Sequence, residues 1–156
     1  MQAKSMRRHL AIYAISGALF TSSVQAGESS HDQIRPGFDA LGREMSTCAA
    51  YFSLLSSIVE HAEGLAAKAE TARRIKSIGQ TLLTQSINVA KLIGMADNTV
   101  MERVRTALKE MVDTVNADPP NSLATMSTKY GRPCDQLLQN APQRFADLIA
   151  RDEQEF

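Results

Sequence analysis

Two cysteines, Cys48 and Cys134, have the most distinctive chemistry in this sequence. The N-terminus has the pattern of an export leader, and two cysteines far apart in an exported chain usually form one disulfide. The alternative is two separate buried thiols. A redox-active thiol is not expected, because the chain has no Cys-x-x-Cys pair to lower a thiol pKa. We therefore predict a structural disulfide between Cys48 and Cys134.

Two tyrosines stand close to these cysteines. Tyr51 follows Cys48 by three residues and Tyr130 precedes Cys134 by four, so a disulfide would bring both tyrosines to one region. Two interpretations stay open. The tyrosines pack around the sulfur atoms and hydrogen-bond at the rim, or they form a small pocket or partner patch beside the disulfide, together with two arginines. The candidate site residues are Tyr51, Tyr130, Arg132 and Arg144.

The candidate for a metal site is His61, which stands between Glu60 and Glu63. Zinc and di-iron sites on helices need histidine and carboxylates three or four residues apart on more than one helix. No second segment repeats this pattern. Covalent haem would need Cys-x-x-Cys-His, which is absent, and non-covalent haem would have to pair His61 with a methionine. Because methionines at core spacing usually serve packing, we expect neither a metal nor a cofactor.

Catalytic and nucleic-acid-binding patterns are also absent from the sequence. There is no glycine-rich phosphate loop, no His-Glu-x-x-His motif and no Gly-x-Ser-x-Gly motif. The chain has 17 basic and 17 acidic residues, and the two signs are interspersed. Binding to phosphate backbones needs clustered lysine and arginine. We therefore expect that the chain is not an enzyme and that it has no nucleic-acid partner.

The N-terminus is typical of a secretory signal peptide. Three basic residues precede an uncharged apolar run at 10–20, and Val24-Gln25-Ala26 supplies the small residues of a cleavage site. The apolar run is shorter than the about twenty residues of a transmembrane helix. Cleavage would therefore leave no stable membrane anchor. The pair Arg7-Arg8 keeps twin-arginine export open beside the general secretory route.

The domain organisation follows from this cleavage site. We predict a signal peptide over residues 1–26 and a single helical-bundle domain over 27–156. The leader carries three basic and no acidic residues, so its removal changes the formal net charge from 0 to −3. We expect the mature protein in the periplasm or outside the cell.

One long apolar stripe organises the mature chain. Its members recur at alternating steps of four and three, which places them on one face of a helix. They are Ile34, Phe38, Leu41, Met45, Cys48, Phe52, Leu55, Val59 and Ala62. Pro36 and Gly37 are expected to begin this helix, and Gly64 to end it. Small residues on its other side, such as Ser46 and Ser56, would let another helix approach closely.

Further helical patterns follow at residues 65–95, at about 99–116, and at 122–131, with a last helix starting at Pro142. A Thr-x-x-Glu capping box marks the start near residue 99. No alternating run of β-branched residues predicts a strand. The sequence thus predicts an all-α fold: an antiparallel helical bundle of three long helices plus one or two short C-terminal helices, stapled by one disulfide.

These patterns lead to two functional hypotheses. The first is an exported bacterial protein that acts as a non-enzymatic binding or interaction module for a protein or an envelope component. The alternative is a carrier of a small ligand, for example haem or a lipophilic molecule, in a cavity between helices.

Overall fold

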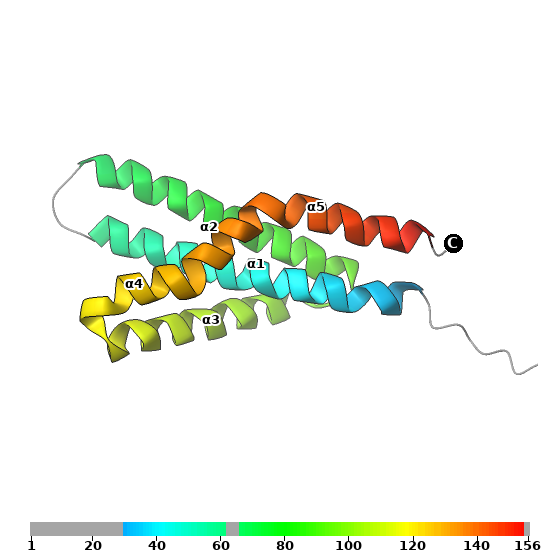
Figure 1. Ribbon diagram of the computed structural model, residues 1–156, viewed down its shortest axis with the longest axis horizontal. Coiled ribbons are helices and arrows are strands. Elements are labelled where there is room, and N and C mark those ends of the chain that lie inside the picture. Colours follow the sequence, from blue (N-terminus) through cyan, green and yellow to red (C-terminus); the bar gives the residue numbers. More distant parts are fainter. Residues whose placement is uncertain (1–29, 62–65, 155–156) are drawn as a thin grey trace, which may run out of the picture.

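A computed structural model describes residues 30–61 and 66–154 of the chain. All elements in these ranges are helices, so the all-α prediction is confirmed. The three long N-terminal helices are α1 (Ser30–His61), α2 (Ala66–Leu92) and α3 (Asp97–Ala117). A C-terminal arm follows, made of η1 (Pro119–Asn121), α4 (Ser122–Met126), the π-helical turn η2 (Ser127–Gly131) and α5 (Arg132–Gln154). Successive long elements run in opposite directions (Figure 1).

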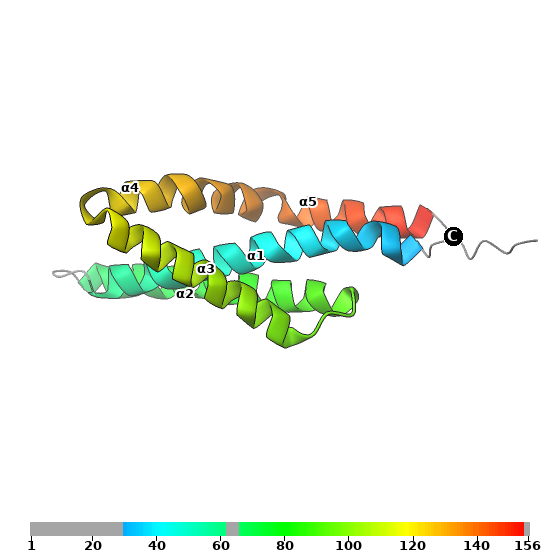
Figure 2. The ribbon, with the colours of Figure 1, turned by 90° about the horizontal axis from the view of Figure 1, so that it is seen from below.

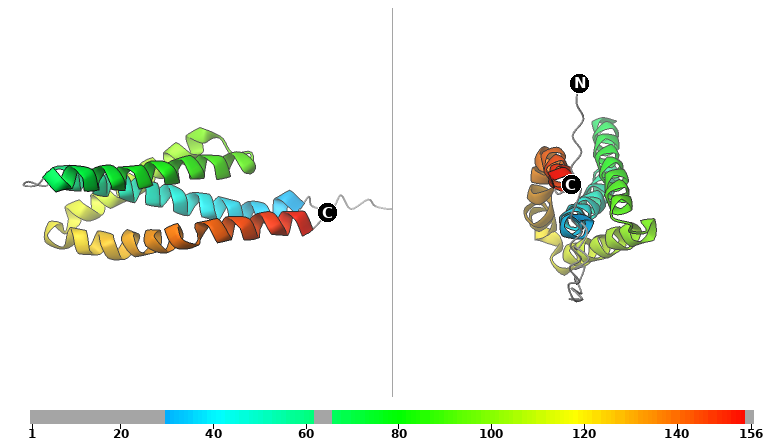
Figure 3. Two further views of the ribbon diagram at one scale, coloured as in Figure 1. Left: turned by 90° about the horizontal axis from the view of Figure 1, so that it is seen from above. Right: turned by 90° about the vertical axis from the view of Figure 1, so that its right-hand side faces the viewer.

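The central helix of the bundle is α1. It packs against α2, α3 and α5, which surround it when the bundle is viewed from one end (Figure 3). The predicted apolar stripe lies in the core from Ile34 to Phe52, and Phe38, Leu41 and Met45 are at most 3% exposed. Its last member, Ala62, lies outside the described residues. Buried side chains of the other helices meet it, among them Leu82, Val89, Met111 and Leu137.

The contact between α1 and α2 depends on small residues. The hydroxyl oxygens of Ser46 and Ser86 are 2.8 Å apart, and they lie 2.9 and 2.8 Å from the carbonyl oxygen of Gly42. The two hydroxyl hydrogens are therefore shared among these three contacts. Further along α2, a Cβ on Gly79 would lie 3.3 Å from the carbonyl oxygen of Ala49. The predicted close approach of a second helix at Ser46 is therefore confirmed.

The third helix is held on α1 by an ion pair as well as by packing. The guanidinium of Arg103 lies 2.6 Å from the carboxylate of Asp39, and both side chains are about four-fifths buried. The start of α3 differs from the capping-box prediction, because the helix begins at Asp97 after Ala96 and shows no side-chain cap. Gly94, at φ +68°, makes the preceding turn.

The first helix begins earlier than the sequence analysis predicted. It starts at Ser30 rather than at Pro36, so Pro36 lies inside α1. Ile34, one turn before Phe38, is buried, and the burial of its apolar side chain stabilises the additional helical turn. The predicted break at Gly64 lies outside the described residues, but α1 and α2 on either side of it are separate and antiparallel (Figure 2).

The C-terminal arm is more continuous than expected. Gly131 does not end a helix, since η2 passes directly into α5, and Pro142 lies inside α5 instead of starting a new helix. A proline ring removes one backbone hydrogen bond and bends a helix without ending it when packing holds both sides. Figure 1 shows such a change of direction within α5. Leu137 and Ala141 before the proline and Phe145 after it all belong to the core or pack against it.

Candidate functional site

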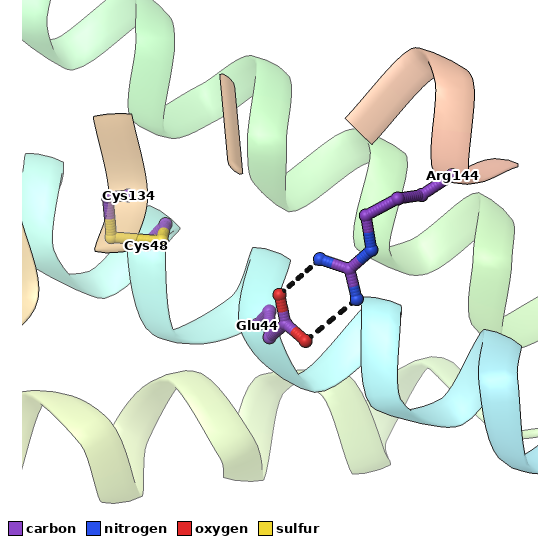
Figure 4. The surroundings of a disulfide bond; sticks show 4 residues. All are labelled: Glu44, Cys48, Cys134 and Arg144. Carbon is purple, nitrogen blue, oxygen red and sulfur yellow. Dashed lines mark hydrogen bonds and ion pairs between the residues drawn. A yellow bond between two sulfur atoms is a disulfide. The ribbon is translucent and has the colours of Figure 1, made fainter. Parts of the chain in front are cut away.

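The disulfide between Cys48 and Cys134 is present, as predicted. It joins the middle of α1 to the first turn of α5, with the two Cα atoms 5.4 Å apart (Figure 4). Both cysteines are at most 3% exposed. The bond closes a loop across 86 sequence positions, and so fixes the C-terminal arm on the central helix.

Arg144 is engaged by an acidic residue one turn before Cys48. Its guanidinium donates to both carboxylate oxygens of Glu44, at 2.5 and 2.9 Å (Figure 4). The hydrogen bonds that Arg144 donates to Glu44 raise the pKa of Arg144 above its usual range. This bidentate pair ties α5 to α1, and the arginine's planar donor face is already used within the chain.

Tyr51 packs against the C-terminal arm. It is 8% exposed, and its ring meets that of Phe52 edge to face. A Cβ built on Gly131 would lie 2.8 Å from the Tyr51 hydroxyl oxygen, so only glycine fits the arm here without a shift. Burial raises the pKa of the Tyr51 phenol, and the nearby charge of Asp135 adds to this effect.

Tyr130 lies in the π-helical turn that precedes Cys134. It is 6% exposed, and its hydroxyl is buried without a hydrogen-bond partner among the described residues. The Lys129 ammonium lies 5.0 Å from the centroid of the Tyr130 ring. The proximity of Tyr130 raises the pKa of Lys129, but the ammonium does not form a hydrogen bond with the Tyr130 hydroxyl. Such π-helical turns often occur at functional sites.

A pocket of about 210 Å³ opens beside the disulfide. It is lined by Arg43, Glu44, Thr47, Cys48, Lys129, Tyr130, Pro133, Cys134 and Leu137. Of the four predicted site residues, only Tyr130 lines it. Tyr51 lies under Gly131, Arg144 reaches the pocket only through Glu44, and Arg132 is exposed. The structure thus places both tyrosines near the disulfide, but it does not gather the two arginines with them.

A larger hollow lies between α2 and α5, and the sequence analysis missed it. Both helices pack on α1 but hardly contact each other. A cavity of about 350 Å³ between them is lined by Met45, Gln85, Asn88, Val89, Ala141, Pro142 and Phe145. A second cavity of about 210 Å³ shares Gln85, Ala141 and Pro142 with the first and adds Ser77, Ile78, Thr81, Leu82 and Leu138. Because these cavities share three lining residues, they are neighbours, and we call them together the α2–α5 groove.

The α2–α5 groove has an apolar floor and an uncharged rim. Met45 of α1 and Val89 of α2 are buried at its base, and Phe145, which stacks edge to face on Phe38, forms one wall. The side-chain amides of Gln85 and Asn88 are exposed at the rim. All residues that line the two cavities are uncharged at neutral pH. The groove can therefore hold an apolar or neutral polar surface, and it offers no ion pair.

Of the group around His61, Glu60 and His61 are described, whereas Glu63 lies outside the described residues. The Nδ1 atom of His61 lies 2.7 Å from the carbonyl oxygen of Ser57, one turn back in the same helix. Across residues 30–61 and 66–154, no three histidine, cysteine or acidic side chains are grouped so that they could hold a metal ion. Within the same ranges, no helix has the length and hydropathy needed to cross a membrane.

The two concave sites described above differ in their lining. Charged side chains take part in lining the pocket beside the disulfide, whereas the larger α2–α5 groove is uncharged. Comparison of the sequence and the structure with protein-family models, with characterised proteins and with solved structures found no match.

Proposed function

We propose that this chain is an exported, non-enzymatic interaction module that binds a protein partner through the α2–α5 groove. The observation that carries the proposal is the neutral lining of a groove that the bundle leaves open. Protein interfaces are depleted of charged residues at their centre, whereas ordinary surface is not. The groove has this composition while the rest of the surface is rich in charge.

The groove also lacks the groups on which most protein catalysis depends. General acids, bases and nucleophiles are titratable side chains or activated hydroxyls. The hydroxyl of Thr81, which lines the groove, donates to the backbone carbonyl of Ser77 at 3.0 Å. The residues that line the groove supply surface for contact, and this supports a binding role over a catalytic one.

Two features support export, which remains part of the proposal. The first 26 residues have the composition of a secretory leader. The domain carries a buried disulfide, and such bonds form and persist in oxidising compartments. Together they favour the periplasm or the exterior of the cell as the place where the partner is met.

The test compares two leucines of similar exposure. Leu138 lines the groove and is 40% exposed, whereas Leu92, at the end of α2, lies outside it and is 50% exposed. We expect native protein drawn from the exported fraction to migrate as a complex larger than the isolated chain. Leu138→Glu should release the isolated chain because it places a charge in the neutral groove. Leu92→Glu should leave the complex intact.

Two results would count against this function. One is a wild-type protein that migrates as the isolated chain in the fraction where it is made. The other is a complex that responds equally to Leu138→Glu and Leu92→Glu, which would show that the groove does not bind the partner. Circular dichroism of both variants checks that each keeps its helical content.

A second candidate function, a carrier of a small neutral ligand, is favoured by the volume of the larger cavity. Small-molecule pockets typically enclose about 300–1,000 Å³, and this cavity measures about 350 Å³. Its residues suit a lipophilic molecule better than haem, because Met45 is present but no histidine lines the cavity. Native mass spectrometry should then show a bound mass, which Ala141→Leu would remove by filling the cavity. A bare protein mass would contradict the carrier function.

A further inference from the structure

One segment of α2 has an exposed side along its whole length and yet carries no charged residue. Residues 77–90 contain no aspartate, glutamate, lysine, arginine or histidine, although Lys76 and Lys91 stand at either end. Fourteen helical residues span about 21 Å. Six of them are exposed, and we call these the neutral face: Ser77, Gln80, Thr81, Thr84, Gln85 and Asn88.

The opposite wall of the groove repeats this feature. In α5, residues 136–143 are also uncharged and are flanked by Asp135 and Arg144. Leu138, in this stretch, is one of the most exposed large apolar side chains described. The outward side of α3 is different, because charged and exposed residues follow one another along it: Glu102, Arg105, Lys109, Glu110 and Asp113. The absence of charge is thus a local property of the α2–α5 side.

The threonine hydroxyls of the neutral face do not need a partner's hydrogen bonds. Thr81 donates to the carbonyl oxygen of Ser77, and Thr84 donates to that of Gln80, each at 3.0 Å. A donor that is already satisfied inside its own helix loses little when water is removed from it. The threonines can therefore be covered by an apolar or neutral surface at small cost.

We propose that the occupant of the α2–α5 groove is a second copy of this chain, an inference that rests on the proposed interaction function. In a two-fold symmetric interface the same patch meets itself, so each charged residue near the axis would face its own copy. Like charges brought together in this way cost several kcal/mol. The neutral face is the stretch of α2 on which two copies meet without that repulsion.

The shape of this side of the molecule allows the contact to be reciprocal. The neutral face forms the α2 wall of the α2–α5 groove, and Gln80 and Thr84 continue this wall away from α5. This wall of one copy can lie against the groove of the other, and a two-fold axis then places the second wall against the first groove. The two α2 helices pack side by side, with each Leu138 facing the partner's α2. Small side chains such as Ser77 and Thr81 allow the helices to approach closely.

The experiment is sedimentation equilibrium of the purified chain alone over a wide concentration range. We expect the wild-type mass to rise from one copy towards two as the concentration increases. Thr81→Lys should weaken the association at least tenfold, because the new ammonium groups face each other near the axis. Thr106→Lys, at an exposed threonine in α3, should leave the association unchanged.

A mixing experiment separates lost association from damaged folding. Thr81→Lys and Thr81→Glu should each be monomeric alone, and an equal mixture should recover the dimer through opposite charges. Full recovery supports the proposal. A wild type that stays monomeric at all concentrations, or a dimer that is insensitive to Thr81→Lys, overturns it. If the purified chain is monomeric but Leu138→Glu still dissolves the complex in the exported fraction, the interaction function stands with a different partner.

Discussion

The contact between Tyr51 and Gly131 leads to a prediction about Gly131→Ala. This substitution should destabilise the protein when residue 51 is tyrosine, but not when residue 51 is phenylalanine. Gly131→Ala adds a methyl group whose carbon would lie 2.8 Å from the Tyr51 hydroxyl oxygen. Such a distance is too short, and the ring cannot move aside freely because it is buried against Phe52. Tyr51→Phe removes the hydroxyl, and the nearest remaining ring carbon is then 3.4 Å away, an ordinary contact.

The magnitudes follow from two opposing effects. Inserting a methylene-sized group into a packed site costs about 1–3 kcal/mol. Replacing glycine by alanine within a helix gains up to about 1 kcal/mol. With Tyr51 present, Gly131→Ala should therefore lower the free energy of unfolding by about 1 kcal/mol or slightly more. With Phe at position 51, the same change should be neutral or stabilising.

The assay is urea unfolding of the wild type, the two single variants and the double variant. The double-mutant cycle should give a coupling energy of about 1–3 kcal/mol between positions 51 and 131. Unconnected sites add to within about 0.5 kcal/mol. A coupling energy inside that limit would refute the reasoning, since it would show that the hydroxyl does not restrict the residue at 131.

Three further predictions follow from other contacts. Replacing both Cys48 and Cys134 by alanine should cost about 4–5 kcal/mol in urea unfolding, because the disulfide closes 86 positions of chain; a loss under about 1 kcal/mol would contradict the entropic account. Ser86→Ala should cost about 1 kcal/mol, since it removes hydrogen bonds to Ser46 and to Gly42, and no change would show that these bonds are not stabilising. The raised pKa of Tyr51 means that the unfolded state loses this proton first as the pH rises through about 10. Stability should therefore fall above that pH, and Tyr51→Phe should make the fall shallower; equal slopes would contradict the assigned burial effect.

The fold could be predicted from the sequence wherever periodicity alone decides it. The stripe through α1 has an unbroken alternation of four and three, and its members from Ile34 to Phe52 are buried as expected, whereas Leu55 and Val59 are only partly buried. The disulfide followed from counting two cysteines in a chain with an export leader. The small side chain of Ser46 predicts the close approach of a neighbouring helix, and its hydroxyl meets that of Ser86 in the core.

The C-terminal arm could not be predicted in this way because tertiary contacts override its local signals. Gly131 reads as a helix end, but its lack of a side chain serves the approach of Tyr51 from another helix. Pro142 reads as a helix start, but packing of Ala141 and Phe145 holds α5 together across it. The first residue of α1 was misplaced for a related reason, since the burial of Ile34 extends the helix beyond Pro36.

The candidate site was predicted only in part. Two tyrosines near the disulfide could be inferred from their spacing, but the direction of Arg132 and the pairing of Arg144 with Glu44 depend on how α5 lies across α1. The α2–α5 groove had a visible signal that periodicity does not capture. The uncharged run at 77–90 in a helix with an exposed side marks a surface that differs from ordinary solvated surface.

The central claim, that the α2–α5 groove is a binding face, is tested most directly by site-specific photo-crosslinking in cells that make the protein. A photoreactive residue at Gln85, on the groove rim, is compared with one at Thr106, on the exposed side of α3. We predict an adduct from position 85 that is several times stronger than from position 106 and that is lost when Leu138→Glu is added. Equal yields at the two positions, or an adduct at 85 that persists with Leu138→Glu, would contradict the assignment of the groove as the binding face.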